Sequence, residues 1–230
     1  MALRVYLAPH HDDILLSLPA RLLAERNRSD RRIVVVFSDE SPEMGTICAR
    51  LHAELGIEVD TMGFREAIHR GVSVRACLRP ARMLRDIYGE SAHLDGIIEN
   101  FTRLFARVRP TELVVPLLSV HIDHALLRAA AERLTCSGSQ WRILYYEDQP
   151  YAALWPQLCA REVALFRRLE DSNESVPVKE VESLLQKTRA LVQGRDLARI
   201  LRYHEPLMLN GVEPLWSDDR HGHKDITLIS

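Results

Sequence analysis

The 230-residue sequence has few cysteines, no excess of either charge and no long hydrophobic run. Its 4 cysteines are widely spaced and form no Cys-x-x-Cys pair, which argues against a disulfide framework and against a thiolate zinc site. Because 30 Lys and Arg residues balance 32 Asp and Glu residues without a basic stripe, nucleic acid is not an expected partner. The beginning of the chain lacks the features of a signal peptide, and no stretch is apolar for long enough to span a bilayer. We therefore expect a cytoplasmic protein without a membrane span.

Two catalytic motifs are also missing from the sequence. No Gly-x-Gly-x-x-Gly follows the first expected strand, which disfavours a nucleotide-binding redox protein. No Gly-x-Ser-x-Gly elbow and no convincing Cys/His pair is present, so a covalent intermediate on the protein is not expected.

Short apolar runs alternate with longer segments of helical periodicity, which is typical of parallel strands joined by crossover helices. This pattern predicts an α/β fold, with a Rossmann-like open, mostly parallel sheet and helices on both faces. The length favours a single domain over residues 1–230. The expected strands are Arg4–Ala8, Ile33–Ser38, Val59–Gly63, Glu112–Leu117 and Arg142–Glu147.

Helical periodicity covers most of the remaining chain. The expected helices are Leu15–Asn27, Met44–Leu55, His93–Val108, His124–Thr135, Pro156–Leu169 and Val178–Tyr203. A polar stretch at residues 170–177 reads as a surface loop, so residues 170–230 are expected to form a helical C-terminal extension.

The first polar cluster, at residues 8–13, lies where the first strand ends and a helix begins, the edge at which open parallel sheets place their ligands. His10 and Asp13, three residues apart across a tight turn, can reach one zinc ion while Asp12 faces a neighbouring water. An alternative is that Asp12 and Asp13 cap the following helix and that both histidines lie near the surface.

A second cluster, His121-Ile122-Asp123-His124, follows the fourth expected strand. If this strand neighbours the first, both loops open onto one crevice and His124 can complete a three-ligand metal site at the C-terminal ends of the strands. The alternative is a capping Asp123 and a packed histidine. Two clusters with both His and Asp at equivalent strand ends favour the metal site.

Residues 9–13 and 121–124 resemble the Pro-His-x-Asp-Asp and His-x-Asp-His motifs of the LmbE-like or PIG-L-type zinc deacetylases. The segment from Tyr145 to Ala152 resembles a Tyr-Glu-Asp-x-Pro-Tyr stretch in one branch of that family. His11 stands where proline is commoner, Ile14 replaces a frequent acidic residue, and residues 17–20 lack the glycines of many members. No ligand position is lost.

The resemblance implies that His10, Asp13 and His124 bind Zn²⁺, that Asp12 is the general base and that His121 stabilises the oxyanion. Asp123 would orient His121 and keep it cationic. The implied activity is removal of an N-acyl group, such as N-acetyl, from an amino sugar or its conjugate. Hydrolysis of another amide, such as a thiol-sugar conjugate or a natural-product intermediate, stays open, as does a non-catalytic sugar-binding domain.

Further polar residues follow the other strands. Arg65 and Arg70 are candidates for binding hydroxyls or a phosphate of the substrate, and the alternative is a solvated helix face. Asp148 either holds sugar hydroxyls or anchors a neighbouring loop, and His11 contacts either the ligand or only solvent. His221 and His223 are either metal ligands or part of an exposed tail. The expected partner is a small N-acylated sugar or glycoconjugate, and the sequence leaves open whether iron or another divalent ion replaces zinc and whether the chain forms homo-oligomers.

Overall fold

A computed structural model of the protein describes residues 3–28, 30–38, 42–73, 77, 91–118, 120–136, 140–168, 176–188, 198–204 and 213–217. His221 and His223 lie outside these residues, so their role stays an expectation from the sequence. Among the described helices, none is both long enough and apolar enough to cross a membrane.

The centre of the fold is a 7-stranded sheet with the order β3-β2-β1-β4-β5-β7-β6. The first five strands pair in parallel, whereas β7 pairs antiparallel with both β5 and β6. The strands are β1 Leu3–Ala8, β2 Arg31–Ser38, β3 Glu58–Phe64, β4 Glu112–Pro116, β5 Arg142–Tyr146, β6 Arg167–Arg168 and β7 Trp216–Ser217. The expected α/β fold and all five expected strands are therefore confirmed, and the short antiparallel edge formed by β7 and β6 was not anticipated.

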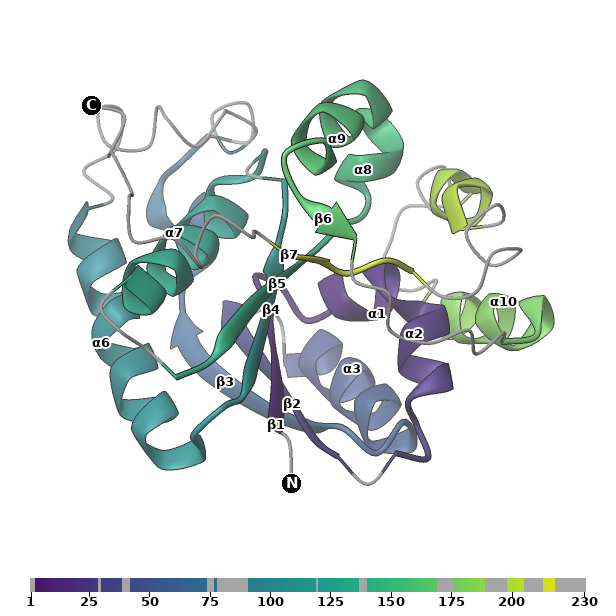
Figure 1. Ribbon diagram of the computed structural model, residues 1–230, viewed down its shortest axis with the longest axis horizontal. Coiled ribbons are helices and arrows are strands. Elements are labelled where there is room, and N and C mark those ends of the chain that lie inside the picture. Colours follow the sequence, from purple (N-terminus) through teal and green to yellow (C-terminus); the bar gives the residue numbers. More distant parts are fainter. Residues whose placement is uncertain are drawn as a thin grey trace.

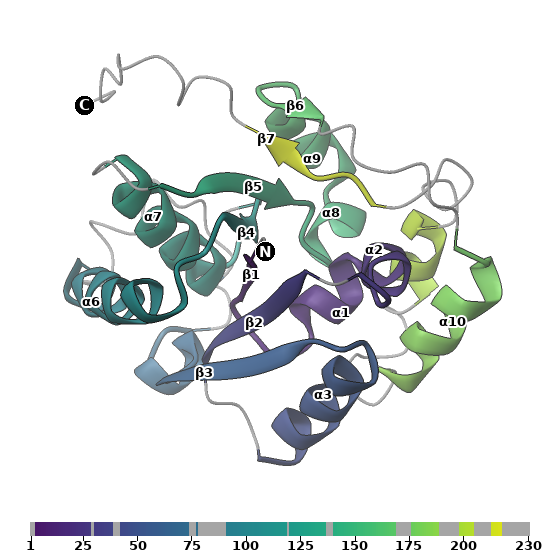
Figure 2. The same cartoon turned by 60° about the horizontal axis from the view of Figure 1, so that its bottom comes forward.

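Helices cover both faces of this sheet (Figures 1 and 2). One face is covered by α1 Asp13–Ser17, α2 Pro19–Ala24, α3 Pro42–Glu54 and α10 Val178–Lys187. The opposite face is covered by α6 Ser91–Val108 and α7 Ile122–Cys136. Alternate residues of β2 enter the two cores: Val34 and Val36 pack on the first face, and Ile33 and Val35 on the second. Because both faces are buried, the strand is a continuous apolar run.

Three helix predictions need correction. The expected helix Leu15–Asn27 is two helices, because the chain leaves helical geometry at Leu18 before Pro19. The helix that begins at Pro156 is α9, Pro156–Val163, and it ends early because the chain turns at residues 164–166 before it enters β6. The expected helix Val178–Tyr203 is described in two parts, α10 and a helical segment over residues 198–204.

Strand order places both polar clusters at one point of the sheet. The chain runs outward from β1 through β2 to β3, and then returns to form β4 on the other side of β1. β1 and β4 pair directly, with Val5 opposite Leu113. The loops after these two strands therefore diverge at the switch point of the topology, where open α/β sheets form their ligand crevices.

The described part of the C-terminal region is fixed by two carboxylates. Glu213 accepts hydrogen bonds from the backbone N–H groups of Ala20 and Arg21, at 3.0 and 2.7 Å, in the first turn of α2. It thereby supplies the acceptor that the N-cap residue Leu18 lacks. Trp216 donates its indole N–H to Glu147 at 2.9 Å.

Candidate metal centre

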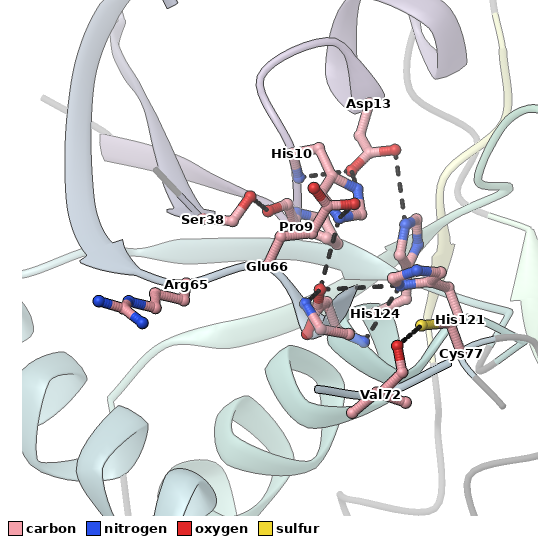
Figure 3. A network of polar contacts seen from close by, with 12 residues as sticks. Pro9, His10, Asp13, Ser38, Arg65, Glu66, Val72, Cys77, His121 and His124 are labelled. Carbon is pink, nitrogen blue, oxygen red and sulfur yellow. Dashed lines mark hydrogen bonds and ion pairs between the residues drawn. The ribbon is translucent and has the colours of Figure 1, made fainter. Parts of the chain in front are cut away.

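The loop after β1 is held in place by the end of β2. Both the backbone N–H and the hydroxyl of Ser38 donate to the carbonyl of Pro9, at 3.1 and 3.0 Å (Figure 3). The next residue, His10, donates its backbone N–H to Asp13 Oδ2 at 2.7 Å. This tight turn, which ends in α1, aims both side chains at the end of β4.

His124 lies in the first turn of α7, and a buried carboxylate fixes its ring. Asp148, directly after β5, lies 2.8 Å from His124 Nδ1 through Oδ2 and accepts the Leu118 N–H through Oδ1 at 2.6 Å. His124 and Asp148 are both fully buried. Burial raises the pKa of Asp148 above its usual range, although its hydrogen bond with His124 opposes that rise. Asp148 therefore holds the ring of His124 and the loop at Leu118, and its role in binding a substrate hydroxyl stays an expectation from the sequence.

His10, Asp13 and His124 come together as a potential metal-binding group. One ligand atom from each lies within 4.8 Å of the others. Asp13 Oδ2 is 3.2 Å from His10 Nδ1, and Asp13 Oδ1 is 3.5 Å from His124 Nε2. Burial would raise the pKa of Asp13, but His124 and His10 lower it below its ordinary value, so the carboxylate is held ionised.

The donor chemistry of this group fits a divalent metal. His124 Nε2 is buried and has no hydrogen-bond partner, while the other ring nitrogen is held by Asp148. A metal-binding histidine usually donates the N–H of its other ring nitrogen to a carboxylate, as His124 does to Asp148. A buried, unsatisfied imidazole nitrogen would otherwise destabilise the fold.

The two remaining residues of the first motif, Asp12 and His11, lie in different environments. Asp12 precedes α1 and is half-buried, and its side chain makes no capping hydrogen bond with that helix. His11 is buried, and its ring packs against Gly45 of α3, where an added Cβ would lie 3.3 Å from it. His11 is therefore not near the surface, and its described packing contact is with α3 and not with the metal-binding group.

His121 differs from the cationic group expected from the sequence. Its Nδ1 accepts the backbone N–H of Asp123 at 3.2 Å, while the Asp123 carboxylate is 3.9 Å away. Burial, followed by the charges of His10 and His124, lowers the pKa of His121 to about 3. The hydrogen bond that Nδ1 accepts places the proton of a neutral imidazole on Nε2.

The Asp123 carboxylate anchors a segment from another strand end. It accepts the Ala67 N–H at 3.0 Å and pairs with Arg70 at 2.9 Å, both in the 3-10 helix η1, Ala67–Arg70. Burial would raise the pKa of Asp123, but its contact with His10 and the charge of Arg70 lower it below its ordinary value. Arg70 thus pairs with Asp123, and its role in binding substrate stays an expectation from the sequence.

Arg65 is exposed, and Figure 3 shows its guanidinium extending away from the histidine cluster. Its backbone carbonyl accepts a hydrogen bond from Arg70 at 2.6 Å. Arg65 therefore points away from the histidine cluster, unlike Arg70, the other residue predicted from that strand end.

Two neighbours of the cluster were missed from the sequence. Glu66 Oε1 lies 3.7 Å from His10 Nε2, and Tyr151 stacks on His121 with ring centroids 6.2 Å apart. Glu66 follows β3 at the same sheet edge as the other candidates, and this position in the sequence could have identified it. Tyr151 begins α8, Tyr151–Leu154, directly after the segment that contains Asp148.

No protein-family model matches the sequence. The chain is 27% identical over 228 residues to the 2'-N-acetylparomamine deacetylase of Niallia circulans, and the match covers 81% of this chain and 80% of that enzyme. This similarity in sequence extends over most of both proteins.

Solved structures share the fold at low sequence identity. A deacetylase of teicoplanin biosynthesis has a TM-score of 0.66 at 18% identity, covering 95% of this chain and 100% of that one. The N,N'-diacetylchitobiose deacetylase of Pyrococcus horikoshii has a TM-score of 0.57 at 12% identity, covering 99% and 87%. A 4-carboxy-2-hydroxymuconate hydratase of Pseudomonas putida reaches 0.52 at 12%, covering 95% of each chain. The chain therefore has the α/β fold of these deacetylases, a fold that also carries other chemistry.

Proposed function

We propose that the protein is a zinc-dependent hydrolase that removes an N-acetyl group from an amino sugar or an amino-sugar conjugate. The observation that carries this proposal is the Asp148–His124 pair, which leaves His124 Nε2 buried and facing Asp13 beside His10. The relative in sequence, a deacetylase of 2'-N-acetylparomamine, supports the choice of an N-acetylated amino sugar as substrate.

His10, Asp13 and His124 would hold the zinc ion, and Asp148 keeps His124 in the tautomer that binds through Nε2. A zinc ion with three protein ligands supplies Lewis acidity, which polarises an amide carbonyl and lowers the pKa of water at its open position.

Asp12 is the proposed general base. It takes the proton from the attacking water and passes it to the leaving amine, which must be protonated before the C–N bond breaks. Its half-buried side chain stands next to Asp13 in the chain and is not used as a helix cap.

His121 is the proposed donor to the carbonyl oxygen as negative charge develops there. Because its Nδ1 accepts the Asp123 N–H, its Nε2–H is the free donor. A neutral, buried imidazole can stabilise an oxyanion by this hydrogen bond without carrying a charge itself. Stacking on Tyr151 fixes the plane of the ring.

The test is to incubate zinc-loaded protein with N-acetylated sugars, nucleotide sugars, glycosides and 2'-N-acetylparomamine, and to measure release of free amine. We expect release from at least one amino-sugar compound and none from the same compound with His124→Ala protein. If the wild type holds zinc and no compound releases amine, the deacetylase proposal fails and a sugar-binding module is favoured.

A further inference from the structure

A second potential metal-binding group overlaps the first. It consists of His10, Glu66 and His121, whose ligand atoms again lie within 4.8 Å of one another. The ring of His10 stands between the two groups: its Nδ1 faces Asp13 at 3.2 Å, and its Nε2 faces Glu66 at 3.7 Å. Figure 3 shows Glu66 beside His10, approaching from a different strand end than Asp13.

Glu66 is fixed in this position by the segment that follows it. The N–H of Ala67 and the guanidinium of Arg70 both bind the Asp123 carboxylate, which ties η1 to the beginning of α7. The Glu66 side chain is 21% exposed, so that a cation can reach it from solvent. The position is therefore both held in place and accessible.

The polar groups around this position are not satisfied by the protein alone. His10 is 8% exposed, and its Nε2 makes no hydrogen bond, although oxygens of Asp123 and Glu66 lie 3.5 and 3.7 Å from it. Within the part of the chain that the structure describes, no Lys or Arg pairs with Glu66, and its ion-pair partner is His10. Carboxylates around a buried imidazole favour a cation.

We propose that Glu66 and His121 form a second, weaker site for a divalent cation, which fills only when the metal is in excess. The site is weaker because His10 already serves the first ion, which leaves two protein donors for the second.

Occupation of the second site is inhibitory, a consequence that rests on the proposed function. The nitrogen of His121 that can take the cation is Nε2, because Nδ1 accepts the Asp123 N–H. For Nε2 to bind the cation, its proton must move to Nδ1, which then gives up the hydrogen bond from Asp123, and this cost adds to the weakness of the site. Nε2 is the same nitrogen that donates to the carbonyl oxygen during hydrolysis, and it cannot bind a metal and donate a proton at once.

The experiment is equilibrium dialysis of the full chain against buffered free Zn²⁺, with metal content measured per chain. Wild-type protein should bind one ion at low free zinc and a second at higher free zinc. Glu66→Gln should keep the first ion and bind the second at least about tenfold more weakly, as expected when a charged donor is removed. His121→Ala should behave in the same way.

Two controls separate this site from unrelated binding. Glu99→Gln, on the exposed surface of α6, should bind both ions as the wild type does. A protein with both His221→Ala and His223→Ala should also keep both ions. A wild type that saturates at one ion overturns the inference, as does a Glu66→Gln protein that keeps the second ion at full affinity or loses the first.

An activity arm uses any amide that the wild type hydrolyses. Amine release should fall at least about tenfold as the second ion binds, and Glu66→Gln should need higher zinc for the same loss. Undiminished release from wild-type protein holding two ions overturns the inhibitory role. If no amide is hydrolysed, the dialysis alone decides whether the second site exists, so the failure of one proposal is distinct from the failure of the other.

Discussion

Asp148 and His124 form a hydrogen-bonded pair, 2.8 Å apart and completely buried, that joins the end of β5 to the first turn of α7. The Leu118 N–H binds the other oxygen of the same carboxylate, so its position is fixed from two sides. The orientation of the proposed ligand is therefore set by a residue that is not itself one of the three proposed ligands.

Asp148→Asn should lower zinc affinity about 10- to 100-fold, the usual effect of removing the carboxylate behind a metal-bound histidine. An amide can still accept from Leu118, but its NH₂ group would face His124 Nδ1 and favour the wrong tautomer. Chelator competition measures the affinity, and Asp95→Asn on the exposed side of α6 is the matched control. Equal zinc affinity in Asp148→Asn and the wild type would show that Asp148 does not orient His124 for metal binding.

The adjacent carboxylates Asp12 and Asp13 should respond differently to substitution by asparagine. Asp13 lies within 3.5 Å of nitrogens of both His10 and His124. Asp13→Asn should therefore lose metal affinity, whereas Asp12→Asn should keep the metal and lose turnover by about a hundredfold, the usual scale for a general base. Metal analysis beside initial rates distinguishes the two. The reverse pattern, with Asp12→Asn emptying the site, would refute the assigned roles.

Thiol reagents should modify the folded protein at Cys136 first. Cys136 is exposed, whereas Cys48, Cys77 and Cys159 are buried. Burial also raises the pKa of Cys77, and burial followed by the charge of Glu147 raises that of Cys159, so both stay as unreactive thiols at neutral pH. Ellman titration should find rapid reaction that Cys136→Ser abolishes, with amine release unchanged. Rapid loss of activity in the Cys136→Ser protein would show that a buried cysteine is accessible after all.

The free energy of unfolding should decrease as pH is lowered, because of His52. Burial lowers the pKa of this residue to about 4 from an ordinary 6.5, and its Nδ1 lies 2.8 Å from the Cys48 carbonyl. Between these two values the unfolded chain binds more protons than the folded one, so stability rises with pH across this window and is lost as pH falls through it. The full contribution is roughly 3 kcal/mol.

His52→Gln removes this titration and retains a donor for the Cys48 carbonyl. Urea unfolding of zinc-free protein at several pH values measures the effect as the difference between wild type and variant. As pH falls from 6.5 to 4, the wild type should lose stability relative to His52→Gln. The exposed control His69→Gln should change with pH as the wild type does. A constant difference between wild type and His52→Gln would show that His52 titrates normally.

Local patterns in the sequence were sufficient to predict the parallel strands. Four of them, β1, β2, β4 and β5, are largely buried apolar runs, whereas β3 lies at the edge of the sheet and has no buried residue. Local patterns did not predict β6 and β7. These strands contain two residues each and are defined by pairing with strands far along the chain. Likewise Glu213 binds α2 and Trp216 binds Glu147 through tertiary contacts that no local pattern reveals.

The same distinction applies to the site. His10, Asp13 and His124 were predicted because they follow adjacent strands, which the pairing of β1 with β4 confirms. Glu66 and Arg70 follow β3, two strands away from β1, and η1 is tied to the cluster by its contacts with Asp123 and by packing of Ala67 on Ile122. These are tertiary contacts, so the sequence suggested the strand end but did not predict Glu66.

The place of β1 in the sheet also has a consequence for the order in which the protein is made. β1 is synthesised before β2 and β3, yet one of its two neighbours is β4, which leaves the ribosome only after β2, β3 and α6. Until β4 is made, the nascent chain presents β1 as an unpaired edge, open to strands of other chains. His10 and Asp13 lie at the end of that edge without His124, so the proposed metal site is completed late in biosynthesis, and a translation product that stops before β4 exposes an aggregation-prone edge and lacks one proposed ligand.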